Sequence, residues 1–429
     1  MPLRRTTAEV RKYRVRRSMA YGAAAGVLSL TLTAVCAGAA SASEAGAQPG
    51  LSAPARSLPV TVRDRVDAER ALLTYQALQR NLYLPRYHLY QCDNTCTSTN
   101  FLGTLWPFGN AFSLTAHLAA LPGVGRAVSA DIAVRQQGLA AYYDPQETSP
   151  AGQPQPPAYA SEVEPPLGAG AATYYDDNAW VALDEMYAYG VTGDARYLRT
   201  AEQIFRFVVS GWDSSSSAPC PGGVFWEDAA GSPRNTVSNA PNAEAGLLIY
   251  QATGQSSYLH WATKMYDWVR GCLQTPDGMY YDHINPDGTI NTALWSYNQG
   301  TMIGAGALLY RATGDRTYLQ QAEQTAAASV SYYGTDGNLD GQPDVFNAIF
   351  FRNLFYLATI SPDPAYRQLA ASYAQTAWSQ DRQANGLISD PDPTGGEDQV
   401  NQTAPMAEIY ALLAGSPPLM PVPPHGHGR

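Results

Sequence analysis

Apolar residues recur every three to four positions through most of the chain, and this spacing predicts helices with one buried face. Alternation with a period of two, which would predict strands, is weak and local. Short stretches rich in Gly, Pro, Asp and Ser separate the periodic segments and favour turns. Twelve helices are predicted, at about residues 62–81, 108–120, 127–142, 177–190, 195–210, 237–252, 256–271, 298–312, 316–331, 345–359, 364–379 and 401–414.

Three of the predicted turns share one sequence pattern. YGVTGDARYLRTA begins at Tyr189, YQATGQSSYLHWA at Tyr250 and YRATGDRTYLQQA at Tyr310, so successive copies begin 61 and 60 residues apart. A looser copy, YLATISPDPAYRQLA, begins at Tyr356. In the three closer copies a helix ends at Thr-Gly, where Gly can adopt a left-handed C-cap, and a second helix follows a short polar turn. The pattern therefore predicts a repeated helical hairpin.

The twelve helices pair into six hairpins. Six hairpins can close on themselves, and then no terminal repeat needs a polar cap. We therefore predict an all-α fold, an (α/α)6 toroid (six-hairpin barrel), over about residues 61–415; an open solenoid is the alternative. A toroid has a central depression rimmed by the loops between helices, and loops commonly carry functional sites.

The two ends of the chain differ in composition from the helical part. The N-terminal sequence is basic, then apolar, and Ala40-Ser41-Ala42 matches a signal-peptide cleavage pattern, so residues 1–42 are predicted to be a signal peptide. A transmembrane anchor is the alternative, which the many small residues in the apolar run disfavour. Residues 43–60 are predicted to be a linker and residues 416–429 a disordered Pro-rich tail. A secreted, extracellular protein is expected, with no membrane association after cleavage.

The charge balance excludes one class of partner. Removal of residues 1–42 takes away seven Lys or Arg and one Glu, which changes the formal net charge from −10 to −16. So acidic a chain is a poor nucleic-acid binder, because phosphate contacts need Lys and Arg. A neutral partner such as a polysaccharide is easier to accommodate.

Four cysteines remain after export, and an even number in an oxidising compartment predicts disulfides. Cys92–Cys96 would close a short loop, and Cys220–Cys272 would join two distant segments. A metal site is disfavoured, because CxxC spacing and nearby His residues are missing from the sequence.

Asp176 and Asp177 stand side by side at the predicted start of a helix, in the stretch YYDDNAWVAL. Helix capping is the simple explanation, but one Asp would serve that purpose, and a second adds repulsion that raises the pKa of one carboxyl in a dry site. Paired carboxylates also perform glycoside hydrolysis. Retaining enzymes hold the two carboxyls about 5 Å apart, and successive Cα atoms are about 3.8 Å apart, so adjacency favours retention over inversion.

The stretch YYDDNAWVAL resembles the signature of glycoside hydrolase family 76, the endo-α-1,6-mannanases. Further segments are similar to the family in the same order over about residues 65–415: LWPFGNAFSL, GGVFWED, NTVSNAPNAEAGLLIY, WSYNQGTMIGAGALLY, FNAIFFRNL and NQTAPMAEIYALL. The resemblance implies an (α/α)6 toroid, Asp176 as nucleophile and Asp177 as acid/base. It implies a hydrolase of α-1,6-mannan. We expect a monomer that needs no cofactor and no metal.

Several polar and aromatic residues near these motifs are candidates for substrate binding. Aromatic rings can stack on sugar faces or pack in loop cores, and amides can serve hydroxyl groups. Glu227 and Asp228 are rival acids, which we interpret as solvated loop charges. The substrate-binding candidates are Asn110, Phe225, Trp226, Asn239, Tyr297, Asn298 and Gln299.

The sequence leaves two other functions open. One is a carbohydrate-binding or cell-wall protein with weak or no turnover; retention of both aspartates disfavours it. The other is a different sugar enzyme on the same toroid, such as an unsaturated-uronide hydrolase, which would need cationic residues at the site. Asp336–Gly341 (DGNLDG) has part of a calcium-loop pattern, but Asn347 replaces the bidentate Glu, so a plain turn is favoured.

Overall fold

A computed structural model describes residues 62–91, 101–148, 152–335, 337–389 and 398–419. The fold below is that of the compact unit that begins at Val62. The predicted signal peptide and linker, the Cys92–Cys96 bridge, Asp336 and residues 420–429 of the predicted tail lie outside the described residues.

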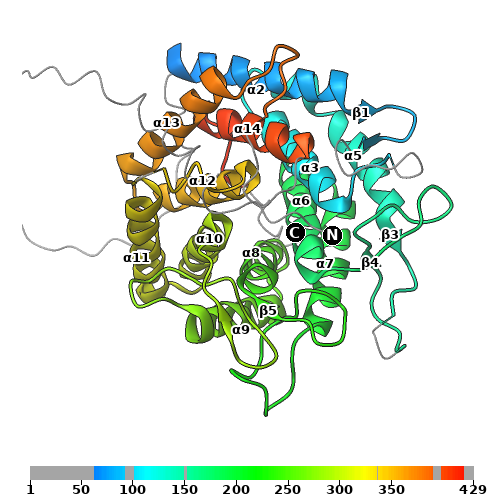
Figure 1. Ribbon diagram of the computed structural model, residues 1–429, viewed down its shortest axis with the longest axis vertical. Coiled ribbons are helices and arrows are strands. Elements are labelled where there is room, and N and C mark those ends of the chain that lie inside the picture. Colours follow the sequence, from blue (N-terminus) through cyan, green and yellow to red (C-terminus); the bar gives the residue numbers. More distant parts are fainter. Residues whose placement is uncertain (1–61, 92–100, 149–151, 336, 390–397, 420–429) are drawn as a thin grey trace, which may run out of the picture. The chain divides into compact units, whose positions relative to one another are not determined.

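Long helices dominate the described part of the chain (Figure 1). Six of them are α3 (Leu105–Ala120), α6 (Tyr175–Thr192), α8 (Thr236–Thr253), α10 (Ser296–Thr313), α12 (Asp344–Ala358) and α14 (Gln399–Leu413). Six more are α2 (Val62–Asn81), α5 (Asp131–Leu139), α7 (Ala195–Ser210), α9 (Ser256–Leu273), α11 (Arg316–Tyr333) and α13 (Pro364–Gln380). Shorter elements are α4 (Gly125–Val128), the 3-10 turn η2 (Ala140–Tyr142), β1 (Tyr83–Leu84), β2 (Leu89–Tyr90), β3 (Tyr143–Asp144), β4 (Ala158–Tyr159), β5 (Arg234–Asn235), β6 (His283–Ile284) and β7 (Ile290–Asn291).

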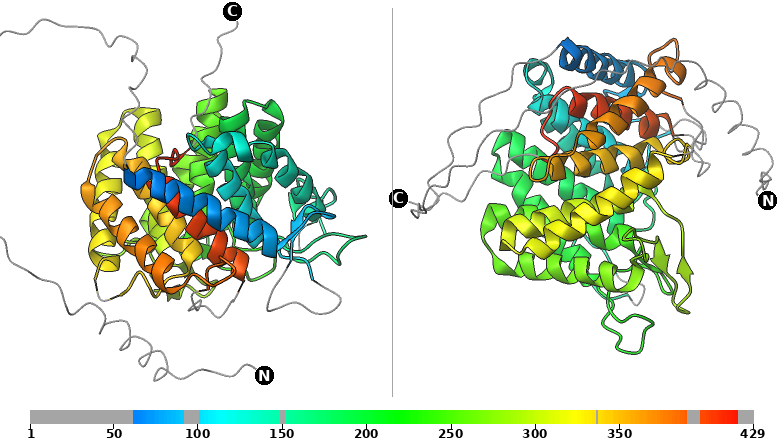
Figure 2. Two further views of the ribbon diagram at one scale, coloured as in Figure 1. Left: turned by 90° about the horizontal axis from the view of Figure 1, so that it is seen from above. Right: turned by 90° about the vertical axis from the view of Figure 1, so that its left-hand side faces the viewer.

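The first six helices form a closed inner ring. Each of α3, α6, α8, α10, α12 and α14 packs against the next, and α14 packs against α3. The other six lie outside: α2 contacts α14, α5 contacts α3, α7 contacts α6, α9 contacts α8, α11 contacts α10, and α13 contacts both α12 and α14. Figure 2 shows α2 (blue) along α14 (red). The closure confirms the predicted (α/α)6 toroid over an open solenoid.

Inner and outer helices differ in how much of their surface is buried. In the inner helix α10 every residue from Ser296 to Leu309 is buried, whereas the outer helix α11 buries one face. Small residues let the inner helices approach closely: a Cβ at Gly300 would lie 2.7 Å from the Cα of Phe350 in α12. The toroid core is therefore made by the inner ring together with the inward faces of the outer helices.

The repeated turns form as the sequence predicts. Gly193, Gly254 and Gly314 are left-handed C-caps, with φ of 70°, 67° and 76°. In two copies an Asp then caps the following outer helix: Asp194 accepts a hydrogen bond from the backbone of residue 196, and Asp315 from that of residue 317. Each such turn reverses the chain from an inner to an outer helix.

One predicted helix is not continuous in the structure. The segment predicted as one helix over 127–142 is divided into α4, α5 and η2, with a break at Ser129 and Ala130. The break precedes Asp131, in the first turn of α5, whose carboxylate accepts a hydrogen bond from Tyr75 Oη at 2.6 Å. Ser and Asp favour helix starts over helix interiors, which explains why a new helix begins here.

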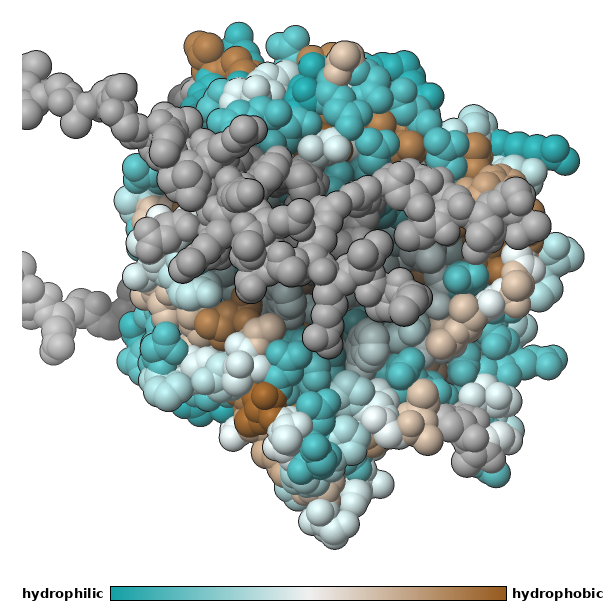
Figure 3. Space-filling view, in the orientation of Figure 1, coloured by the Kyte–Doolittle hydropathy of each residue, from teal (hydrophilic) through white to brown (hydrophobic). Residues whose placement is uncertain are grey.

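The predicted bridge between Cys220 and Cys272 is confirmed as a disulfide that joins the α7–α8 connection to α9. In the described ranges we find no helix with both the length and the apolar character that a membrane span requires. Figure 3 shows a face on which hydrophobic residues are scattered among hydrophilic ones, wherever residues are coloured.

Candidate active site

Asp176 and Asp177 occupy the first turn of α6. The N-cap is Tyr174, whose backbone is extended and whose side chain does not cap the helix. One oxygen of Asp176 accepts a hydrogen bond from the Asp177 backbone N–H at 3.0 Å, and the other accepts from Trp226 Nε1 at 3.1 Å. The positive end of the helix dipole also favours a negative charge here. These two hydrogen bonds and the helix dipole stabilise the ionised form of Asp176.

Both carboxyl groups have raised pKa values, because protein atoms crowd them although each keeps some solvent exposure. Burial raises the pKa of Asp176 to about 7, and its hydrogen bonds to backbone N–H groups and Trp226 oppose the rise. Burial raises the pKa of Asp177 well above its ordinary value, and the charge of Asp176 adds to the rise. The arrangement favours one ionised and one protonated carboxyl.

A third carboxyl, Asp282, acts on the same site. Its charge raises the pKa of Asp176. It pairs with His283 Nδ1 at 2.9 Å and accepts a long hydrogen bond from Asn298 Nδ2 at 3.4 Å. Sequence analysis missed Asp282, because the stretch YYDHI carries no pairing signal and lies about a hundred residues from Asp176.

The loop between α7 and α8 brings Trp226 to the aspartates. The Trp226 carbonyl accepts from Tyr175 N at 2.9 Å, and its N–H donates to the Pro233 carbonyl at 2.8 Å. The indole lies 5.0 Å from the Tyr174 ring, centroid to centroid, and Trp226 is 37% exposed. Phe225, next to it, is partly exposed. Trp226 thus lies beside Asp176, and Phe225 precedes it in the same loop.

Tyr297, on α10, stacks in parallel on Phe346 with ring centroids 3.8 Å apart. Burial raises the pKa of Tyr297 well above its ordinary value, and the charges of Asp282 and Asp176 contribute, so its hydroxyl is near both acids. Asn298 follows Tyr297 and is buried, with its amide directed to Asp282. Asn110, on α3, is partly exposed and donates to Asn401 Oδ1 at 2.8 Å.

Two predicted amides have backbone partners. Asn239 accepts from Val224 N at 2.9 Å and donates to the Val224 and Asn235 carbonyls. Gln299 accepts from Tyr280 N at 2.8 Å and donates to the Tyr280 and Trp295 carbonyls. Both amides are fully buried. Each amide accepts from the N–H and donates to the carbonyl of the same loop residue, as the backbone of a neighbouring strand would. In this way the two amides hold the loops that border the site.

Asn178, in α6, makes the same pair of hydrogen bonds with the backbone of Tyr159, in β4. Asn178, Asn239 and Gln299 each stand four residues after the N-cap of an inner helix, at Tyr174, Asn235 and Trp295. The role of Asn178 was not predicted, and this shared register in the sequence is the signal that could have found it.

Comparison with known proteins identifies the family. The sequence model of glycosyl hydrolase family 76 matches residues 162–415, more than half of the 429-residue chain. This chain belongs to glycosyl hydrolase family 76. Asp176, Asp177, Trp226 and Asp282 all lie within the matched residues.

Relatives and solved structures agree with the family assignment. Mannan endo-1,6-alpha-mannosidase DCW1 of Saccharomyces cerevisiae is 26% identical over 184 residues, 39% of this chain and 40% of that protein. This family 76 chain therefore matches about two fifths of the length of that relative. A family 76 mannosidase from Bacteroides thetaiotaomicron is similar in structure, with TM-score 0.69, 25% identity, and coverage of 81% of this chain and 98% of that one.

An inactive variant of the family 76 α-1,6-mannanase of Salegentibacter, in complex with α-1,6-mannotriose, has two consecutive aspartates replaced by asparagine. It is similar to this chain with TM-score 0.62 and 24% identity, and covers 81% of this chain and 99% of that one. At this identity the likeness concerns the family 76 fold.

Proposed function

We propose that this family 76 protein is a secreted, retaining glycoside hydrolase that cleaves α-1,6-mannosidic bonds in mannan-type polysaccharide, with residues 61–415 as the catalytic domain. The observation that carries the proposal is the pair Asp176–Asp177 on the first turn of α6, with unequal environments and an exposed Trp226 beside them. The names of the relatives and the replaced aspartate pair in the inactive mannanase support it. The disulfide supports secretion.

The unequal environments of the two carboxyl groups support the two proposed roles. Asp176 receives a backbone N–H and the Trp226 indole N–H, so it is the nucleophile that attacks the anomeric carbon and forms a mannosyl-enzyme. Asp177 is kept protonated by burial and by the charge of Asp176, so it donates a proton to the departing oxygen. In the second step Asp177 takes a proton from the water that releases the sugar.

The remaining candidates divide by what their side chains contact. Trp226 is exposed and Phe225 is partly exposed, and both are proposed to stack on sugar rings, together with Tyr297, which is 9% exposed. Asn110 and Asn298 are proposed to bind hydroxyl groups. Asn239 and Gln299 are proposed to contribute through the loop backbone that they hold.

A mannan assay tests the function. The protein is expected to release reducing ends from linear α-1,6-mannan, and NMR of the first products should show the α-anomer before mutarotation. Early β-anomer would contradict retention. Binding without release of reducing ends would favour the carbohydrate-binding alternative. An unsaturated-uronide hydrolase is disfavoured because Arg352, the cation of the family segments, is 3% exposed and paired with Glu408 at 3.0 Å.

The pH dependence of kcat/KM should be bell-shaped. Activity requires ionised Asp176, whose pKa is raised to about 7, so activity is expected to fall as the pH drops through about 7. Activity also requires protonated Asp177, whose pKa burial and Asp176 raise further, so it is expected to fall again at higher pH. A profile still flat well below pH 7 would contradict the assigned environments.

A further inference from the structure

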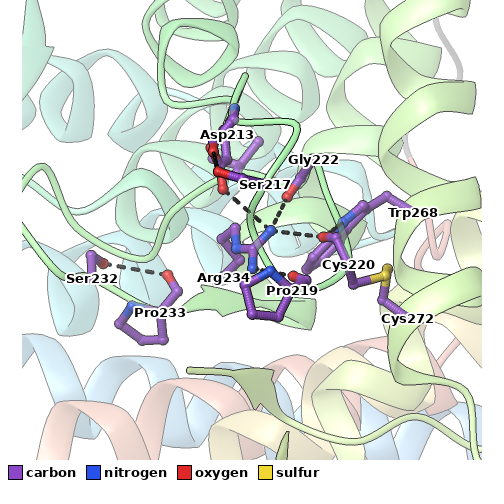
Figure 4. A network of polar contacts seen from close by, with 12 residues as sticks. Asp213, Ser217, Pro219, Cys220, Gly222, Ser232, Pro233, Arg234, Trp268 and Cys272 are labelled. Atoms are coloured by element: carbon purple, nitrogen blue, oxygen red, sulfur yellow. Dashed lines mark hydrogen bonds and ion pairs between the residues drawn. A yellow bond between two sulfur atoms is a disulfide. The ribbon is translucent and has the colours of Figure 1, made fainter. Parts of the chain in front are cut away.

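The connection between α7 and α8 contains a tight, irregular turn at residues 219–223. Cys220, Gly222 and Gly223 have positive φ values of 48°, 101° and 84°. Such backbone does not extend a strand ladder or a helix, so its carbonyl groups need other donors. The carbonyl groups of Pro219, Cys220 and Gly222 all point to one side chain, that of Arg234 (Figure 4).

Arg234 satisfies this turn from inside the protein. Its Nη1 donates to the carbonyls of Cys220 and Gly222 at 2.8 and 2.7 Å, and its Nη2 donates to that of Pro219 at 2.6 Å. The Asp213 carboxylate lies 3.3 Å away and balances the charge. Arg234 is 2% exposed, and a buried guanidinium is tolerated only with such partners. The planar fork matches several acceptors at once, which a lysine does less well.

The backbone of Arg234 continues directly to the active site. Arg234 forms a β-bridge with Phe225, and the neighbouring Pro233 carbonyl accepts from the Trp226 N–H at 2.8 Å. The Trp226 carbonyl in turn accepts from Tyr175 N, at the start of α6. Arg234 thus contacts the turn with its side chain and the Phe225–Trp226 segment with its backbone.

The far side of the turn is fixed as well. The Cys220–Cys272 disulfide and a hydrogen bond from Trp268 Nε1 to the Cys220 carbonyl, at 3.2 Å, attach the turn to α9. A Cβ at Gly223 would lie 2.5 Å from the Trp268 ring. Because α9 fixes one side of the turn, Arg234, which contacts the other side, also fixes the position of the Phe225–Trp226 segment relative to α9.

We propose that Arg234 is a positioning residue of the hydrolase: by clamping the turn at 219–223 it sets the Phe225–Trp226 segment so that the Trp226 indole reaches Asp176. This inference rests on the proposed function. A misplacement of about 1 Å can cost about 100-fold in rate, so Arg234→Met is expected to lower kcat by up to about 100-fold. Arg234→Lys keeps the charge and should recover part of that loss.

Hydrogen–deuterium exchange tests the clamp without any reaction. In Arg234→Met, peptides covering 219–228 and 173–177 are expected to exchange faster than in the native protein, and peptides of α11 should not change. The control is Arg196→Met, which removes an exposed arginine on α7 with 75% of its side chain accessible. Faster exchange confined to 219–223 would overturn the proposal. If Arg234→Met does not fold, Arg234→Lys and Asp213→Asn should show the same change in smaller measure.

The pH profile separates a positioning role from a merely structural one. Asp177, Asp282, Tyr174, Tyr297 and Trp226 interact with Asp176, and the Trp226 hydrogen bond lowers its pKa. Arg234→Met and Trp226→Phe should therefore move the acidic limb of kcat/KM to higher pH, by equal amounts. The double variant should move it no further.

Additive shifts, or a native profile in Arg234→Met, would overturn the clamp. Absence of mannan cleavage by the native protein would refute the proposed function. The exchange experiment would then still show whether Arg234 fixes the Phe225–Trp226 segment.

Discussion

Asp176→Asn is expected to remove the hydrolysis of linear α-1,6-mannan, because no ionised oxygen remains to form the mannosyl-enzyme. Asp177→Asn is expected to lower kcat by about 10²–10⁴-fold, since it removes proton transfer and leaves the nucleophile. Reducing-end release by the native protein and both variants measures the two losses. Asn is nearly the size of Asp, so the helix start should keep its structure in both variants.

A substrate with a good leaving group distinguishes the two roles. An aryl α-1,6-mannobioside whose phenolate departs without a proton should still be attacked in Asp177→Asn, with a rapid first release of phenol and slow turnover after it. Asp176→Asn should release none. Asp228→Asn is the matched control: its carboxylate is in the Trp226 loop and accepts from Gln155 at 2.5 Å. Mannan hydrolysis that persists in both Asp176 and Asp177 variants would place the chemistry elsewhere.

The fold could be predicted because its signals are local. The Thr-Gly turns need only one left-handed residue and a nearby cap, and Gly193, Gly254 and Gly314 supply it in the expected positions. The prediction of one helix over 127–142 was wrong. The apolar spacing is the same for one continuous helix as for two helices in line, and the polar residues at 129 and 131 favour a helix boundary. Ring closure depends on long-range packing of α14 on α3, which the count of hairpins suggested but did not require.

The candidate site could be predicted in part. Asp176 and Asp177 are adjacent, so their pairing needs no tertiary information. Asp282 is brought to them by the ring, and the sequence contains no signal of that approach. The sequence does not reveal the partners of Asn239 and Gln299, because a side-chain amide can bind a sugar hydroxyl or a backbone peptide group equally well. The position of the loop in the fold determines that both bind loop backbone.

The second large effect is expected at a buried charge inside the inner ring. Arg352 of α12 is 3% exposed and donates from Nη1 to Glu408 Oε1 and Ser113 Oγ, both at 3.0 Å. The carboxyls of Asp184 and Glu244 are close enough for Arg352 to lower their pKa values against the larger effect of burial. Arg352 is therefore the cation shared by several acids of three other inner helices.

No neighbouring group can replace this charge. His117 Nε2 lies 3.5 Å from Glu408, but burial lowers the pKa of His117 to about 4, so the imidazole is neutral at pH 7. Arg352→Met would remove the cation that the buried carboxyls of Glu408, Asp184 and Glu244 share. Removal of one partner from a buried pair costs about 3–5 kcal/mol, and the free energy of unfolding from urea titration is expected to fall by that amount.

A second substitution should restore part of the loss. In Arg352→Met/Glu408→Gln the unpaired charge is gone, and a buried pair replaced on both sides is often nearly neutral in stability. Arg316→Met, on the exposed face of α11, is the control and should change the unfolding free energy by less than about 0.5 kcal/mol. A double variant less stable than Arg352→Met would contradict this account. Recovery would mean that the charge pair holds the inner ring in one arrangement rather than adding net stability, and that Arg352 serves the scaffold.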